Sequence, residues 1–390
     1  MGTDSISSRI RRPGRRPARE RWRGSVVLIV LITIAFATVA MYAFIERASN
    51  DLLVEKRSSD ATRLRLEAYS ALETTLAVLE DFRQVNGVLR SPSEGWSDPL
   101  TFAGYQPAEG RTVEVSFVDE SSKYSLPNVT LATLVNLFKA WEIPDSDGAR
   151  LADAILGWMK KDYVAVSAGA PEAEDYEREE IPYDPPGRPL RSFSELATIA
   201  VARDLFYDQA GQPNALWHRF VSVFSLYSFQ APNINGASPE LFAGLGITNT
   251  LEQKQLDDYI HGRGLFENKG AGYFKSSQDV AAMFGGQSPA AGLSTQISSL
   301  RIIVTVREGR SSFRINALIA PPGGATIPAA QTDPDTKANQ NGNTNTNATA
   351  TPSTTDTAAS QTTKKLNYPF TILEFRENDE MPSLPQPASS

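Results

Sequence analysis

The sequence lacks cysteine altogether and has only two histidines in 390 residues. The absence of cysteine excludes disulfides, thiolate nucleophiles and cysteine-ligated metals. The histidines, His218 and His261, lie on separate predicted helices, and neither stands in a catalytic or metal-binding motif. The strings G-x-S-x-G and H-E-x-x-H and the phosphate-binding glycine loop are also missing. The sequence therefore offers no recognisable catalytic site, and we do not expect an enzyme.

One long stretch lacks charge completely. Residues 25–44 read SVVLIVLITIAFATVAMYAF, twenty residues without a charged side chain. At about 1.5 Å per residue, such a helix spans the ~30 Å hydrocarbon core of a bilayer. A cleaved secretory signal is the alternative, but the run is longer than the usual signal core and no A-x-A-like site follows it. We therefore predict a single transmembrane helix over residues 25–45.

Acidic residues outnumber basic ones except in the segment before residue 25. Without the first 24 residues, 30 basic and 43 acidic side chains remain, a net charge of −13. Such an acidic chain argues against a nucleic-acid partner. The leader, residues 1–24, holds two acids and eight arginines: Arg9, Arg11, Arg12, Arg15, Arg16, Arg19, Arg21 and Arg23. The positive-inside rule keeps this basic leader in the cytoplasm, so we expect an inner-membrane protein whose C-terminal domain is periplasmic.

Arg23, Gly24 and Ser25 join the leader to the apolar run without a spacer. This junction resembles the processing site of type IV prepilins and pseudopilins, where a membrane-embedded prepilin peptidase cuts after the glycine. The resemblance implies cleavage between Gly24 and Ser25. Most of these proteins carry glutamate at mature position five, which is Ile29 here. One member of the type II secretion set, protein K, commonly lacks that glutamate. With Ile29 at this position, the sequence resembles protein K more than the other pseudopilins.

The helical pattern continues past the membrane run. No glycine or proline occurs from Glu46 to Val85, and Asn86-Gly87 then ends the pattern. Apolar residues recur there at spacings of three and four: Tyr69, Leu72, Leu76, Leu79 and Phe82. A solvated stalk is the alternative for the upper part of this segment. We predict one long spine helix, as in pilins.

Alternating apolar residues predict strands on either side of a helical region. Residues 111–118 alternate, and Asp119 to Ser122 predict a turn into a returning strand at 123–126. The string FVDESSKYSLPNV resembles the hairpin of the protein K family. Residues 300–306 and 313–319 predict a second hairpin across Glu308-Gly309-Arg310. Strands before and after the helical residues 127–290 indicate that these are inserted between strands of one sheet.

The helical region carries a remnant of an acidic motif. Helices are predicted at 131–141 and 149–160, with Asp145 and Asp147 capping the second. In the protein K family this helix ends in D-W-x-D-x-D and leads into a loop that can hold calcium. Here the string is GWMKKD, which keeps Trp158 and Asp162. We therefore expect no cofactor; calcium is implied by the resemblance alone. The acidic residues of 169–180 predict a solvated loop.

Residues 231–247 (APNINGASPELFAGLGI) predict the start of a helix-hairpin-helix-like unit, whose second helix is 251–263. The residues that define it are Asn233, Asn235, Ser238, Leu245 and Gly246. The asparagine string resembles protein K and falls in the family's order. Such units also grip DNA backbones, but residues 233–263 carry a net charge of −2, which is unsuited to phosphate contact. A packing role is favoured.

The predicted architecture is α+β, in seven segments. A long N-terminal transmembrane and spine helix packs on a small antiparallel sheet, the pseudopilin fold, with a large helical domain inserted between strands. The segments are the leader 1–24, the membrane helix 25–45, the spine and first strands 46–126, the helical insertion 127–290, the hairpin 291–320, a Thr/Asn-rich disordered linker 321–365, and a last strand and tail 366–390.

Resemblance to protein K over residues 20–320 implies a minor pseudopilin at the tip of a type II secretion pseudopilus. Its partners would be other minor pseudopilins, the secretion apparatus, the prepilin peptidase and the membrane. The alternative is a signal-anchored periplasmic binding protein or an adhesion protein like those of type IV pili. Substituting Gly24 with a bulky residue distinguishes the two readings.

Overall fold

The computed structural model describes residues 22–245, 247, 249–283, 292–328 and 369–378. The chain forms two compact units, Met1–Arg63 and Leu64–Ser390, and the helix α1 (Trp22–Asn86) runs through both. The predicted long helix is therefore continuous over 65 residues. It ends where the sequence indicates, because Gly87 takes a left-handed conformation with φ of 78°.

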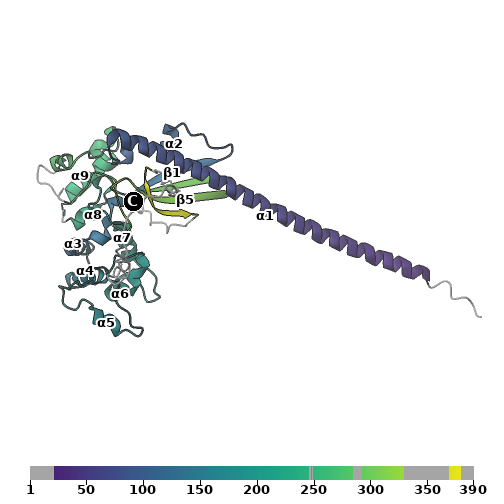
Figure 1. The fold of residues 1–390 in the computed structure, drawn as a ribbon, viewed down its shortest axis with the longest axis horizontal. Coiled ribbons are helices and arrows are strands. Elements are labelled where there is room, and N and C mark those ends of the chain that lie inside the picture. The colour runs from purple at the N-terminus through teal and green to yellow at the C-terminus, as the bar shows by residue number, and fades with distance from the viewer. Residues whose placement is uncertain (1–21, 246, 248, 284–291, 329–368, 379–390) are drawn as a thin grey trace, which may run out of the picture. The chain divides into compact units, whose positions relative to one another are not determined.

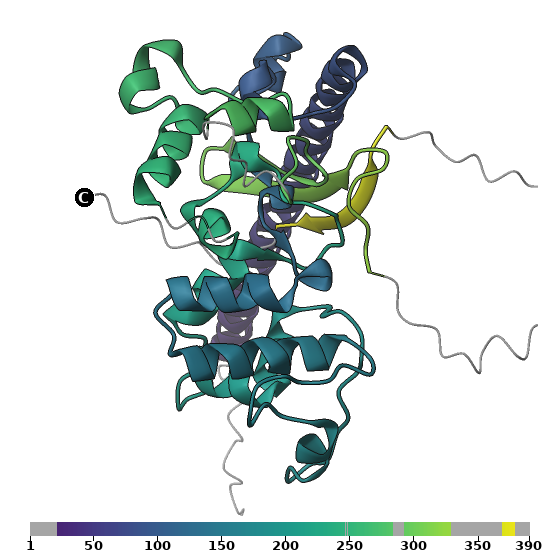
Figure 2. The same ribbon diagram turned by 90° about the vertical axis from the view of Figure 1, so that its left-hand side faces the viewer.

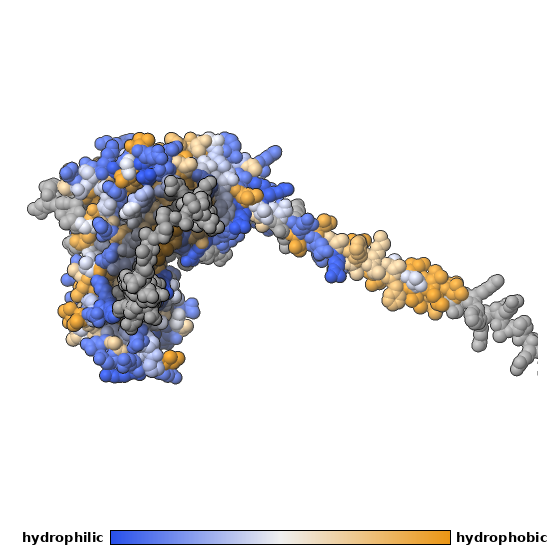
Figure 3. All heavy atoms as spheres, viewed as in Figure 1, coloured by the Kyte–Doolittle hydropathy of each residue, from blue (hydrophilic) through white to orange (hydrophobic). Residues whose placement is uncertain are grey.

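The first unit contains the apolar part of α1. Val26–Leu52 is a 27-residue span with mean hydropathy 2.6, and none of its most apolar window is buried. Among the described residues it is the one helix long and apolar enough to cross a membrane. Hydrophobic side chains cover this part of α1 in the face drawn in Figure 3. Such a surface is unfavourable in water, so the helix needs an apolar environment.

The second unit is built on a four-stranded antiparallel sheet with strand order β1-β4-β5-β6 (Figure 1). Its strands are β1 (Thr112–Asp119), β4 (Leu300–Glu308), β5 (Ser311–Ala320) and β6 (Thr371–Glu377). The predicted hairpin of β4 and β5 is present, with Leu300 opposite Ile319. The sheet therefore joins strands from three distant parts of the sequence.

One face of this sheet packs on α1. Alternate residues of β4 and β5, including Ile302, Val304 and Ile315, are fully buried there. They contact Leu72 and Leu79 of α1, as the spacing of three and four predicts. Burying each of these side chains contributes roughly 1.5–3 kcal/mol, so the α1 contact is a principal source of head stability.

The helical region lies between β1 and β4 in sequence and has its own core. In Figure 2 the helices α3 and α4 of this region lie side by side. Its helices and a short parallel sheet are α3 (Leu131–Ala140), α4 (Asp145–Met159), α5 (Ala173–Glu177), α6 (Ala200–Phe206), α7 (Ala215–Val223), α8 (Pro239–Gly244), α9 (Thr250–His261), α10 (Ser277–Met283), β2 (Tyr124–Ser125) and β3 (Phe224–Ser225); a short helix α2 (Pro99–Phe102) precedes β1. The large helical insertion expected between strands is thus present.

The predicted first hairpin is wrong. Residues after β1 form a 3-10 turn, Glu120–Ser122, because the Asp119 carboxylate accepts a hydrogen bond from the Ser121 amide. The next strand, β2, then pairs in parallel with β3 of the helical region. The partner of β1 is β4, with Thr112 opposite Arg307. The residues after β1 have the composition of a hairpin turn, but the backbone hydrogen bonds of β1 are made with β4, which lies far along the chain.

The predicted aspartate cap of α4 is also wrong. The N-cap position is Pro144, which makes no side-chain cap bond. Asp145 and Asp147 lie instead in the first turn of α4. Their negative charges favour the positive end of the helix dipole there.

The C-terminal strand is held firmly to the sheet. In β6, Glu374 lies 3.1 Å from Arg301 and accepts the Tyr227 hydroxyl at 2.9 Å. Glu377 accepts the Tyr69 hydroxyl of α1 at 2.6 Å and pairs with Arg65 at 2.8 Å. These contacts make the expected last strand an integral part of the head.

The predicted linker begins later than the sequence suggests. Within residues 321–328, Ala325 is only 4% exposed and its amide donates to the Ser298 carbonyl at 2.7 Å. The next residue, Thr326, pairs with Ser228 through backbone hydrogen bonds. The remainder of the linker, 329–365, and residues 1–21 of the leader 1–24 lie outside the described residues.

Deleting residues 330–363 is expected to leave the thermal midpoint of the head within about 2 °C, because shortening a surface loop changes little free energy while its ends still meet. The ends do meet here, since Ala320 of β5 pairs with Thr371 of β6. Circular dichroism melting of the detergent-solubilised protein checks this. A loss of about 5 °C or more would show that the deleted residues pack.

Candidate functional site

The predicted asparagine string lies at the junction between the sheet and the helical region. Asn233 is fully buried. Its side-chain amide donates to the Arg90 carbonyl at 2.9 Å and to the Asp119 carboxylate at 2.7 Å. Its side-chain oxygen accepts the Asn235 amide at 3.2 Å, and its own amide donates to the Ser121 carbonyl at 2.7 Å. One side chain therefore connects the loop after α1, the end of β1 and the 3-10 turn Ile234–Gly236.

Asn235 connects a second set of segments. It is 5% exposed, and its side-chain amide donates to the carbonyls of Phe274 and Thr295, each at 3.1 Å. Its side-chain oxygen accepts the Phe274 amide at 2.7 Å. Thr295 leads directly into β4, so Asn235 ties the helical region to the strand that follows it.

Ser121 completes this asparagine junction, by which we mean Asp119, Ser121, Asn233 and Asn235 with their partners. The Ser121 hydroxyl donates to Asp119 at 2.6 Å and accepts the Ser298 amide at 2.9 Å. These polar groups are satisfied by one another, which is the condition for burying them. Ser121 is fully buried, so its hydroxyl does not face a substrate. Its geometry suits joining two parts of the head.

Asp119 is the charged member of the junction. Burial raises its pKa to about 7, against the hydrogen bonds from Ser121 and Asn233 that lower it. The sequence identifies this residue only as part of a turn, whereas the partner of its half-buried carboxyl, Asn233, lies more than a hundred residues away.

The stability of the head is therefore expected to depend on pH through Asp119. A carboxyl whose folded pKa is raised stabilises the fold below its unfolded pKa of 3.8, and this contribution is lost as the pH rises through about 7. The free energy of unfolding should fall between pH 5 and pH 8, by at most about 3 kcal/mol, and should level off above pH 7. Asp119→Asn should remove this slope, which denaturant titrations at several pH values measure.

Asp98→Asn is the matched control. Asp98 is an exposed helix cap whose pKa is lowered by hydrogen bonds from Thr101. Its substitution should leave the slope between pH 5 and pH 8 unchanged. If wild type and Asp119→Asn have parallel pH profiles, Asp119 does not titrate in this range.

The other predicted site residues lie as follows. Ser238 occupies the N-cap position of α8, but its side chain makes no cap bond. Leu245 follows α8 and packs against the helical core, and Gly246 lies outside the described residues. The two helices of the predicted unit are present as α8 and α9, and Gly262, with φ of 63°, ends α9.

The processing junction lies at the start of α1. Gly24 and Ser25 are in its first turns, and Ile29 follows with 58% exposure. His218 and His261 lie on α7 and α9, and His261 contacts Asp257 of its own helix at 3.0 Å. Sequence reasoning missed this neighbour, although the spacing of four on a helix indicates it.

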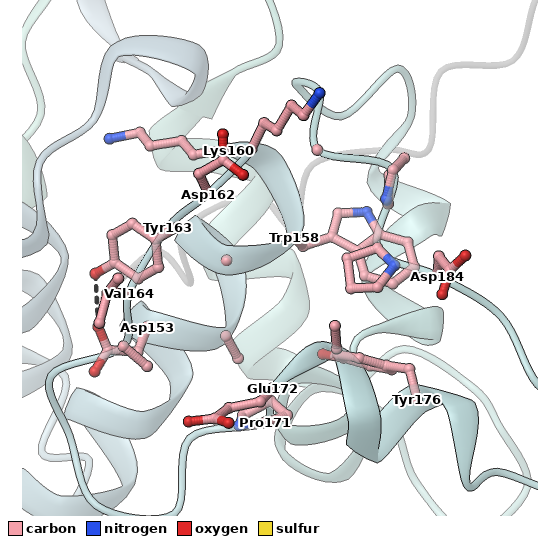
Figure 4. Close-up of a pocket in the computed structure, with 18 of the residues that line it drawn as sticks. Asp153, Trp158, Lys160, Asp162, Tyr163, Val164, Pro171, Glu172, Tyr176 and Asp184 are labelled. Carbon is pink, nitrogen blue, oxygen red and sulfur yellow. Dashed lines mark hydrogen bonds between the residues drawn. The ribbon is translucent and has the colours of Figure 1, made fainter.

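A cleft of 720 Å³ opens beside the C-terminal end of α4 (Figure 4). The loop after α4, the helix α5 and residues 184–191 line it. The string GWMKKD forms part of this wall, with Trp158 buried and Asp162 in a left-handed conformation with φ of 59°. The cleft is thus the place where the family resemblance implies calcium.

Residues 116–210 match the family described as "Type II secretion system (T2SS), protein K". The match covers about a quarter of the chain, so this part of the chain is similar to protein K. The matched residues begin in β1 and include Asp119, α4 and the cleft, but end before Asn233.

One solved structure is also similar to this chain. It is titled "The Crystal Structure of the GspK-GspI-GspJ complex from enterotoxigenic Escherichia coli Type 2 Secretion System". The likeness has 13% sequence identity and a TM-score of 0.44, over 70% of this chain and 96% of the other. The sequence matches none of the curated proteins.

Proposed function

We propose that this chain is a minor pseudopilin of the protein K type, that it is the tip subunit of a periplasmic type II secretion pseudopilus, and that α1 anchors it in the inner membrane. The observation that carries the proposal is the size of the insertion. Residues 120–299 lie between β1 and β4, two strands that are neighbours in the sheet. A head enlarged in this way is unsuited to close stacking on both sides within a filament.

The membrane part of α1 supports the same position. Ile29 gives the span an apolar side chain where most pseudopilins have a carboxylate, and the described side chains of Val26–Phe44 include no charge. An unpaired charge in a bilayer centre costs roughly 2.5–3.5 kcal/mol on insertion scales. A carboxylate that pairs with the subunit above has no use in a subunit with nothing above it.

The orientation follows from charge. Eight arginines precede the span, so the leader stays in the cytoplasm and the head is periplasmic. The prepilin peptidase would remove the leader at Gly24. We further propose that the protein catalyses no reaction and acts through its contacts with sister minor pseudopilins and the secretion apparatus.

Co-purification tests the partnership. The full chain, tagged and extracted in mild detergent together with its sister minor pseudopilins, should elute as a complex with one copy of each. Native mass spectrometry gives the stoichiometry. A protein that elutes alone, or that binds cell-wall material instead, would support the signal-anchored binding protein and contradict the pseudopilin assembly.

A further inference from the structure

Asp153 of α4 closes the loop that follows this helix. It is only 2% exposed. One carboxylate oxygen accepts the Tyr163 hydroxyl at 2.6 Å, which Figure 4 marks with a dashed line. The other accepts the amides of Val166 at 3.2 Å and Ser167 at 2.7 Å, together with the Ser167 hydroxyl. Four donors from the loop thus converge on one side chain, and we name this set the Asp153 clasp.

These four hydrogen-bond donors stabilise the negative charge of the Asp153 carboxylate. Burial raises the pKa of the carboxyl, but hydrogen bonds from Ser167, Tyr163 and Val166 outweigh it, so the pKa is lowered. The group is therefore ionised at neutral pH. A carboxylate that accepts this many hydrogen bonds needs no cation to be stable in a protein.

Arg150 of α4 contacts a backbone carbonyl further along this loop, where a bound calcium ion could otherwise lie. The Arg150 side chain donates to the Gly169 carbonyl at 2.9 Å. Backbone carbonyls in loops are common calcium ligands. Here the Gly169 carbonyl binds the guanidinium of Arg150 and not a metal ion.

The remaining acids of the cleft do not converge. Figure 4 places Asp162, Glu172 and Asp184 at separate margins of the cleft. Glu172 caps α5. Gly157 and Lys160 stand where the motif D-W-x-D-x-D has its first two aspartates. Among the described residues, no group of three or more His, Cys, Asp or Glu side chains is placed to hold a metal ion. Calcium takes six to eight oxygen ligands, so these residues do not fit the ion that the resemblance implies.

We propose that the loop after α4 is closed without metal, by the Asp153 clasp in place of calcium. The clasp and the Arg150 bond supply the tethers that a bound ion would otherwise provide. The head of this chain is therefore independent of calcium. This inference concerns the cleft and holds whichever position the chain takes in a filament.

Chelation and substitution test the proposal on the full chain in detergent. The thermal midpoint should be the same in 1 mM calcium chloride and in EGTA. Asp153→Asn should lower it by about 5 °C in both, because an amide nitrogen then faces buried donors of the loop. Trypsin provides a local readout, since Lys160 and Lys161 are exposed at the start of the loop. Cleavage there should be slow in wild type with or without EGTA, and faster in Asp153→Asn.

Two further variants separate the clasp from a metal site. Tyr163→Phe removes one donor and should loosen the loop in the same direction as Asp153→Asn, with a smaller effect. Asp184→Asn removes a carboxylate of the cleft without touching the clasp and should change neither readout. If EGTA lowers the midpoint or speeds tryptic cleavage, and calcium restores it, or if calorimetry detects calcium binding that Asp184→Asn abolishes, the proposal is wrong.

Discussion

Replacing Gly24 with valine is expected to leave the whole population of the protein with residues 1–24 attached. A peptidase that cuts at this junction must bring its catalytic groups close to the backbone, and glycine permits that approach because it has no side chain. A β-branched residue blocks it. Mass spectrometry of membrane-extracted protein should find Ser25 at the N-terminus of wild type and Met1 in Gly24→Val.

Ser25→Ala is the control, because it alters the other side of the cleaved bond and keeps a small residue there. It should be processed as wild type is. An N-terminus at Ser25 in Gly24→Val would contradict the assignment of the cleavage site. A wild-type N-terminus beyond Phe44 would instead indicate a cleaved secretory signal.

Asn233→Ala is expected to have the largest effect on stability. It removes three side-chain hydrogen bonds and leaves the groups of Arg90, Asp119 and Asn235 without these partners. One of them is the half-buried carboxyl of Asp119, for which the loss of a partner is costly. We expect the free energy of unfolding to fall by about 3–5 kcal/mol, as measured by denaturant titration.

Asn249→Ala is a matched comparison. Asn249 is also an N-cap asparagine, and its side chain accepts the Leu251 amide at 3.0 Å, but the residue is exposed. Losing such a cap costs about 1 kcal/mol. If the two substitutions destabilise the head equally, the asparagine junction does not hold the sheet and the helical region together.

The features predicted correctly from sequence are those with a local period. The stripe from Tyr69 to Phe82 and the alternation from Leu300 to Ile319 specify which side chains face the core, and the structure buries these faces against each other. Helices α8 and α9 also follow from local signals, namely proline at the start and glycine at the end. Such patterns need no information about distant residues.

The features that were missed depend on distant partners. Asp119 to Ser122 predicts a hairpin turn, yet β1 pairs with β4, and the Asp119 carboxyl is held by Asn233. Asp153 has no motif of its own, because its donors come from a loop whose path only the fold defines. The asparagine string stands out in the sequence, but its partners Arg90, Phe274 and Thr295 do not.

The position of this subunit in the pseudopilus is the central claim, and labelling tests it most directly. An epitope placed within residues 330–363, where the chain leaves and re-enters the sheet at Ala320 and Thr371, should be tolerated. Isolated pseudopili can then be stained with gold-coupled antibody and viewed by electron microscopy. A tip subunit predicts gold at one end of each filament and none along the shaft. Gold at regular intervals along the filament would contradict the claim, because a cap occurs only once per filament end.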